Sequence, residues 1–153
     1  MEIPLSPFMQ RALDLAQEAA LAGEVPVGAV IVRNGVEIAA CANAMRALKD
    51  PTAHAELEAI RAAARAIGNE RLDDCDLWVT LEPCPMCAGA IAHARIARVY
   101  YAAPDPKGGG VDHGPRIFTQ PTCHHRPDVY SGLGEAQASD QLRAFFAAKR
   151  SAQ

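Results

Sequence analysis

Apolar residues recur three and four positions apart in four stretches of the chain, which is the pattern of amphipathic helices. Residue types that favour helix ends flank these stretches, such as Ser6 before the first and Gly68 after the second. Helices are predicted over residues 7–22, 50–67, 83–94 and 135–150.

Runs rich in β-branched residues lie between the predicted helices. Residues 25–32 are followed by Asn34-Gly35, the favoured two-residue hairpin turn, and residues 36–43 can return antiparallel. Further strands are predicted over residues 76–81, 98–102 and 129–130. A hairpin followed by alternating strands and helices predicts a mixed sheet of roughly five strands with helices on both faces. The expected fold class is a three-layer α/β/α domain.

Two residues inside the predicted strands invite more than one interpretation. Gly28 indicates either a β-bulge or a close approach of the backbone to a ligand. Trp78 is expected in the core rather than on a stacking surface.

Composition limits the classes of protein to which the chain can belong. At 153 residues, half of them hydrophobic, we expect residues 1–153 to form a single domain. Five cysteines, an odd number at irregular spacing, indicate reduced thiols rather than a disulfide framework. The N-terminus lacks a secretion signal, and no apolar run approaches the roughly 18 residues of a membrane span. The expected location is the cytoplasm, without a membrane partner.

The overall charge gives no general attraction to nucleic acid. The net charge is −3 and the pI about 5.9, whereas nucleic-acid-binding domains usually carry a basic patch. An RNA substrate would need a local basic surface.

Three potential metal ligands lie at the starts of two predicted helices. His54 offers an imidazole, and Cys84 and Cys87 offer two thiolates one helical turn apart. This donor set suits zinc and leaves its fourth tetrahedral position open to water, as in catalytic sites. The positive ends of the helix dipoles would stabilise the thiolates. A structural zinc would need a fourth protein ligand.

Glu56 is the predicted catalytic residue. It lies two residues after His54 in the first turn of the same helix, where both side chains can overhang the helix end. A carboxylate there can move protons to and from whatever the metal activates. A Cys-x-x-Cys pair alone is a weak signal, but His-x-Glu combined with Pro-Cys-x-x-Cys is the signature of zinc deaminases acting on nucleobases.

The other cysteines and histidines have weaker claims to function. Packing is the expected role of Cys41, Cys75 and Cys123, and His93 is expected to be structural. The adjacent pair His124-His125 lies in the Gly- and Pro-rich segment 104–127 and is assigned a substrate or surface role.

The sequence resembles the bacterial tRNA-specific adenosine deaminases, within the cytidine/deoxycytidylate deaminase superfamily, over nearly its whole length. The resemblance lies in residues 25–30 (VPVGAV), 50–56 (DPTAHAE), 80–90 (TLEPCPMCAGA), 93–96 (HARI), Asp105-x-Lys107 and the terminal Phe145-Phe146-x-x-Lys149-Arg150. It implies a cytidine-deaminase-like fold, a homodimer, and conversion of adenosine to inosine at the wobble position of an arginine tRNA anticodon loop.

The resemblance also implies roles for single residues. His54, Cys84 and Cys87 would hold Zn²⁺. Glu56 would take a proton from the zinc water and deliver protons to purine N1 and the departing amine, while C6 is attacked.

Five further residues are implied to bind the substrate. Asn43 matches the base-contacting asparagine of the family and Asp105 the loop aspartate near the flipped nucleotide; the others are Val27, Gly28 and Ala55.

The segment after Lys107 departs from the family pattern. The family continues with Thr-Gly and Gly-Ser-Leu elements, whereas residues 108–113 read Gly-Gly-Gly-Val-Asp-His. His124 also stands where an asparagine is usual. The substrate loop is therefore where this chain differs from its relatives.

Two alternatives to a tRNA deaminase remain at this point. A deaminase of a free base or nucleoside, such as guanine or cytosine, would need only a small closed pocket, and the acidic pI favours it. A noncatalytic zinc module for RNA or protein binding would make Glu56 dispensable.

Overall fold

A computed structural model describes residues 4–152 of the chain. Its helices are α1 (Pro7–Leu21), α2 (Met45–Leu48), α3 (Ala55–Ile67), α4 (Pro85–Ala94) and α5 (Glu135–Ser151), with a 3-10 turn, η1, at Ile117–Thr119. Its strands are β1 (Gly28–Arg33), β2 (Val36–Ala42), β3 (Cys75–Leu81), β4 (Arg98–Ala103) and β5 (Asp128–Ser131). None of the helices in this described part is long and apolar enough to cross a bilayer.

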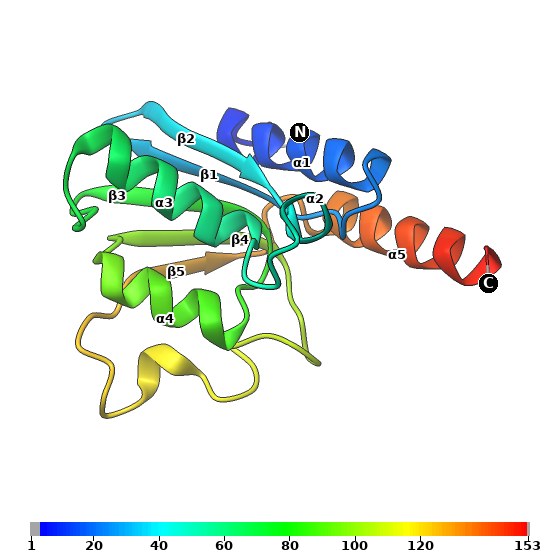
Figure 1. Ribbon diagram of the computed structural model, residues 1–153. Coiled ribbons are helices and arrows are strands. Elements are labelled where there is room, and N and C mark those ends of the chain that lie inside the picture. Colours follow the sequence, from blue (N-terminus) through cyan, green and yellow to red (C-terminus); the bar gives the residue numbers. More distant parts are fainter. Residues whose placement is uncertain (1–3, 153) are drawn as a thin grey trace.

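The strands form one mixed sheet in the order β2-β1-β3-β4-β5. β1 pairs antiparallel with β2 and β3, whereas β4 pairs parallel with β3 and β5. Helices α1 and α5 cover one face of the sheet, and α3 and α4 cover the other (Figure 1). The predicted three-layer α/β/α fold is thereby confirmed.

Alternation along β1 explains how one strand serves two cores. Ala29 and Ile31 pack in the cluster with α3 and α4, while Val30 and Val32 pack in the cluster with α1 and α5. A strand buried on both faces needs apolar residues at every position, which accounts for the uninterrupted β-branched run.

Trp78 belongs to the core beneath α1, as predicted. Its ring stacks on Tyr100 with a centroid separation of 3.9 Å and an interplanar angle of 5°, and Tyr100 stacks in turn on Tyr130. The Trp78 side chain is only 9% exposed and lies in the cluster on the α1 and α5 face.

Gly28 is required by the packing of α1 against the sheet. A Cβ atom at this position would lie 2.0 Å from the carbonyl oxygen of Ala12, inside the helix backbone. The bulge interpretation is wrong, because Gly28 pairs regularly with Ala42 and the register shift of this hairpin falls between Ile31 and Val32.

The structure moves the start of the second predicted helix from residue 50 to Ala55. The Asp50 carboxylate accepts hydrogen bonds from the backbone N–H and the hydroxyl of Thr52, which form a local turn instead of a helical one. His54 is therefore the extended N-cap of α3. The third predicted helix similarly begins at Pro85, with Cys84 as its extended N-cap.

The short helix α2 was not predicted. Its four residues are too few to show a helical period. Glu24, which is 3% exposed, holds its start by accepting hydrogen bonds from the backbone N–H groups of Arg46 and Ala47. α2 ends at Leu48, and the next residue, Lys49, adopts a left-handed conformation with φ 50°.

Segment 104–127 contains one short regular element, η1, and nevertheless packs onto the rest of the molecule. Val111 and Phe118 bury their side chains in the core cluster beside α3 and α4. The His125 ring nitrogen Nε2 lies 2.6 Å from the carbonyl oxygen of Ile96. This loop is therefore an ordered wall of the molecule.

Candidate metal centre and substrate pocket

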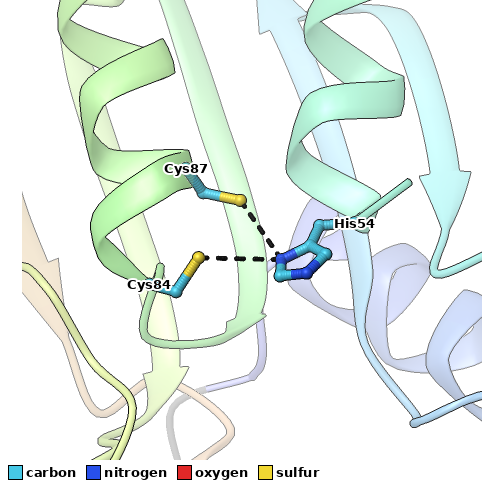
Figure 2. Close-up of side chains that lie close together, drawn as sticks. All are labelled: His54, Cys84 and Cys87. Carbon is cyan, nitrogen blue, oxygen red and sulfur yellow. Dashed lines mark hydrogen bonds between the residues drawn. The ribbon is translucent and has the colours of Figure 1, made fainter. Parts of the chain in front are cut away.

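The N-termini of α3 and α4 bring three side chains together. His54 caps α3, Cys84 caps α4, and Cys87 lies in the first turn of α4. Their donor atoms all lie within 4.8 Å of one another. Figure 2 shows both sulfur atoms pointing at Nδ1 of the His54 ring.

The spacing of these atoms fits a zinc ion. The Sγ atoms of Cys84 and Cys87 lie 3.7 and 3.5 Å from Nδ1 of His54. Zinc–sulfur bonds of about 2.3 Å and zinc–nitrogen bonds of about 2.0–2.1 Å at a tetrahedral angle separate the two ligands by about 3.6 Å. His54, Cys84 and Cys87 can therefore hold Zn²⁺ with little movement.

The two cysteines differ in their protonation. A hydrogen bond from Cys87 and a further one from His54 lower the pKa of Cys84 to about 4. The same contact with Cys84, together with burial, raises the pKa of Cys87. Zinc binds both sulfurs as thiolates, so metal binding near neutral pH displaces the proton that the raised pKa keeps on Cys87.

Glu56 lies beside the metal ligands and is 4% exposed. Burial raises the pKa of its carboxyl to about 7, and the nearby Cys84 thiolate acts in the same direction. A carboxyl with a pKa near neutrality can both accept and return a proton, as general acid–base catalysis requires.

A pocket of about 230 Å³ opens over these groups. Its lining comes from the residues before β1, after β2 and at the end of β3, from the starts of α2, α3 and α4, and from segment 104–127. The lining residues are Val25, Val27, Asn43, Met45, His54, Glu56, Leu81, Glu82, Cys84, Asp105 and Gly108.

Asn43 holds two walls of this pocket together. Its amide nitrogen donates to the carbonyl oxygen of Val25 at 3.1 Å, and its Oδ1 accepts from the N–H of Ala55 at 2.8 Å. The side chain therefore links the segment before β1 to the first residue of α3.

The structure separates the five predicted substrate residues into two groups. Val27, Asn43 and Asp105 line the pocket. Gly28 faces α1, and the Ala55 side chain is fully buried with its N–H engaged by Asn43. Neither of these two is among the lining residues.

The remaining candidates lie away from the metal ligands. Cys75 is buried in the core, and Cys41 and Cys123 pack against it, as predicted. His93 is exposed rather than enclosed, and with His124 it lines a separate cleft between α4 and η1.

Sequence reasoning missed Met45 and Glu82 as lining residues. The start of α2 brings in Met45, and no pattern predicted that helix. The sequence does contain a signal for Glu82, because this carboxylate directly follows an apolar strand. A carboxylate in such a place is rarely buried unless hydrogen-bond donors surround it.

Known proteins share both this fold and this site. Residues 4–103 match the family model described as the cytidine and deoxycytidylate deaminase zinc-binding region. The chain is 57% identical over 143 residues to the tRNA-specific adenosine deaminase of Agrobacterium fabrum, covering 94% of each protein.

Solved structures agree with this assignment. One, from work on A-to-I editing by tRNA:A34 deaminases at the wobble position of transfer RNA, has a TM-score of 0.87 and 57% identity, covering 88% of this chain and 98% of that one. A guanine deaminase from Bacillus subtilis has a TM-score of 0.62 and 51% identity, covering 63% and 62%.

The fold and the His-Cys-Cys cluster thus define a zinc-dependent hydrolytic deaminase. The chain belongs to the family of tRNA-specific adenosine deaminases, which the high identity over nearly the full length of both proteins establishes.

Proposed function

We propose that this protein converts adenosine to inosine at the wobble position of a tRNA anticodon loop. The observation that carries the proposal is the convergence of His54, Cys84 and Cys87 beside buried Glu56, at the base of a pocket walled by loops. Similar proteins are named as tRNA-specific adenosine deaminases or as deaminases that edit the wobble position of transfer RNA.

Zinc held by His54, Cys84 and Cys87 would supply Lewis-acid activation of a water molecule. The Glu56 carboxylate would take up one proton from that water and deliver it to N1 of the adenine ring as the oxygen adds to C6. It would then take up the second proton from the new C6 hydroxyl and deliver it to the amine, which leaves as ammonia. In the protein without metal, burial raises the pKa of the Glu56 carboxyl, which brings its protonated and ionised forms closer in free energy near neutral pH.

The base would lie between Val27 and the loop that carries Asp105, with Asn43 beside it. A target base must leave its stack to reach such a pocket, and a single-stranded anticodon loop lowers the free-energy cost of that step. Lys107 is exposed next to the pocket-lining Asp105 and Gly108, where it can meet the phosphate backbone.

We also propose that residues 1–153 act as a single deaminase domain, that the protein works as a homodimer, and that it acts in the cytoplasm. The dimer rests on the resemblance to the bacterial tRNA-specific adenosine deaminases, and the tRNA substrate of that family supports the location. Measuring the molar mass of the protein in solution at micromolar concentration tests whether it is a dimer.

A deaminase of free guanine is the second candidate, favoured by the likeness to the Bacillus subtilis guanine deaminase. The test is incubation of the zinc-loaded protein with an anticodon stem-loop carrying a wobble adenosine, and separately with guanine, cytosine and adenosine. Inosine in the stem-loop supports the first function. Ammonia from the free bases alone would overturn it.

A further inference from the structure

Glu82 carries a buried charge outside the catalytic chemistry. It follows β3 directly and its side chain is 0% exposed. Burying a carboxylate is costly unless several hydrogen-bond donors compensate it. The source of those donors indicates what the residue does.

Every donor to Glu82 comes from residues 105–113, here called the 105–113 loop. Oε1 accepts from the N–H of Asp105 at 3.1 Å and lies 2.7 Å from Nδ1 of His113. Oε2 accepts from the N–H groups of Val111, Asp112 and His113 at 3.2, 3.0 and 3.1 Å. One carboxylate therefore ties both ends of the loop to the strand that precedes the cysteine ligands.

The glycines of this loop make that close approach possible. A Cβ atom on Gly109 would lie 2.4 Å from Oε2 of Glu82 and 2.5 Å from the carbonyl oxygen of Asp105. A Cβ atom on Gly110 would lie 2.5 Å from the backbone nitrogen of Pro85, the first residue of α4. The loop thus wraps around Glu82 and against the start of the helix that carries Cys87.

The first part of the 105–113 loop borders the pocket. Asp105 and Gly108 line it, and the Asp105 carboxylate accepts from the N–H groups of Lys107 and Gly108 at 3.3 and 2.9 Å. At the other end, the Asp112 carboxylate accepts a hydrogen bond from the Tyr101 hydroxyl of β4. A chain of contacts therefore runs from Glu82 through the loop backbone to Asp105.

We propose that Glu82, together with His113, is a positioning residue that fixes the 105–113 loop and so sets the place of Asp105 on the substrate pocket. The link to substrate rests on the proposed function; the link to loop order does not. Glu82 is one of the residues around the pocket, but its side chain is 0% exposed because the loop covers it, so it acts through the loop rather than on the substrate.

The test compares zinc-loaded Glu82→Gln, His113→Gln and a matched control, Asp76→Asn. Asp76 lies on β3, the strand that Glu82 follows, and pairs with Arg98 near the start of that strand. Hydrogen exchange is measured at the amides of residues 105 and 111–113, and kcat and KM are measured with the anticodon stem-loop.

In Glu82→Gln, an amide NH₂ group must face backbone N–H donors, because both carboxylate oxygens accept from the loop. We expect these amides to exchange about tenfold faster or more, the effect of losing one hydrogen bond to a charged group. KM rises about tenfold with a smaller change in kcat, and zinc content is unchanged. His113→Gln shows the same pattern more weakly, and Asp76→Asn shows neither effect.

Exchange rates within twofold of the native protein would overturn the proposal, as would faster exchange with an unchanged KM. If Glu82→Gln does not fold, His113→Gln decides, because that side chain is 36% exposed and its loss leaves Glu82 in place. If native protein does not deaminate the stem-loop, the proposed function fails while the exchange measurement still tests the loop.

Discussion

The side chain of Asn43 accepts a hydrogen bond from the backbone N–H of Ala55 at 2.8 Å. Asn43 is 7% exposed and follows β2, while Ala55 is the first residue of α3 and the neighbour of His54. The contact satisfies one of the N–H groups that every helix leaves without an intrahelical partner. It thereby connects the predicted base-contacting residue to the position of a predicted zinc ligand.

Asn43→Ala is expected to lower the free energy of unfolding by about 1–3 kcal/mol, because the buried Ala55 N–H loses its acceptor. Urea unfolding of the zinc-loaded protein measures this. Asn69→Ala is the control, since Asn69 accepts from the exposed Arg71 N–H, which water can satisfy. Equal effects in the two variants would contradict the assigned role.

Glu56→Gln is expected to lower kcat by about 10²–10⁴-fold, the usual contribution of a general acid–base residue. Zinc content should remain that of the native protein, because Glu56 is not among the three clustered ligands. Glu58→Gln in the same helix turn is the control and should keep both activity and metal. An active Glu56→Gln protein would refute a proton-carrying role.

In the zinc-free protein, Glu56 should make stability depend on pH. Burial raises the pKa of its carboxyl from an ordinary 4.5 to about 7. Between these values the folded chain binds more protons than the unfolded chain, so this contribution to the free energy of unfolding falls as pH rises. Native protein should lose stability relative to Glu56→Gln between pH 4.5 and about 7 and level off above.

Urea unfolding with chelator at several pH values measures that difference. Glu58→Gln again serves as the control for loss of a charge from α3. A difference between native protein and Glu56→Gln that stays constant across this range would show that the carboxyl titrates as it does in the unfolded chain.

Gly28→Ala should lower the free energy of unfolding by about 1–3 kcal/mol or more, the usual result of overpacking a core. The new methyl group would lie 2.0 Å from the Ala12 carbonyl oxygen. Gly89→Ala is the control, because a Cβ atom there meets nothing within 4 Å inside α4 and helix propensity favours alanine. Thermal unfolding that ranks the two variants equally would contradict the packing role.

Much of the fold could be predicted because its signals are local. β-branched runs and helical apolar spacing set most elements, and the Asn34-Gly35 turn set the hairpin. Helix starts were less accurate, since the side chain of Asp50 forms a turn that competes with a helical start. The four-residue α2 is too short for any periodic signal.

The metal ligands were predictable because zinc requires particular donor atoms, and few residues supply them. The walls of the pocket were predictable only in part, since Val27, Asn43 and Asp105 line it but other predicted and observed wall residues differ. Gly28 was assigned to the substrate although a distant helix backbone occupies that side of it. Glu82 binds donors more than twenty residues further along the chain, a relationship that no local pattern contains.

The stacked pair of Trp78 and Tyr100 lies on the α1 and α5 face of the sheet, and the metal ligands lie at the starts of α3 and α4 on the other face. Trp78 is the one tryptophan of the chain. The sheet therefore separates the intrinsic fluorophore from the catalytic chemistry. Tryptophan emission can therefore follow unfolding in all the variants above, and the emission of the folded state should be the same whether or not zinc is present.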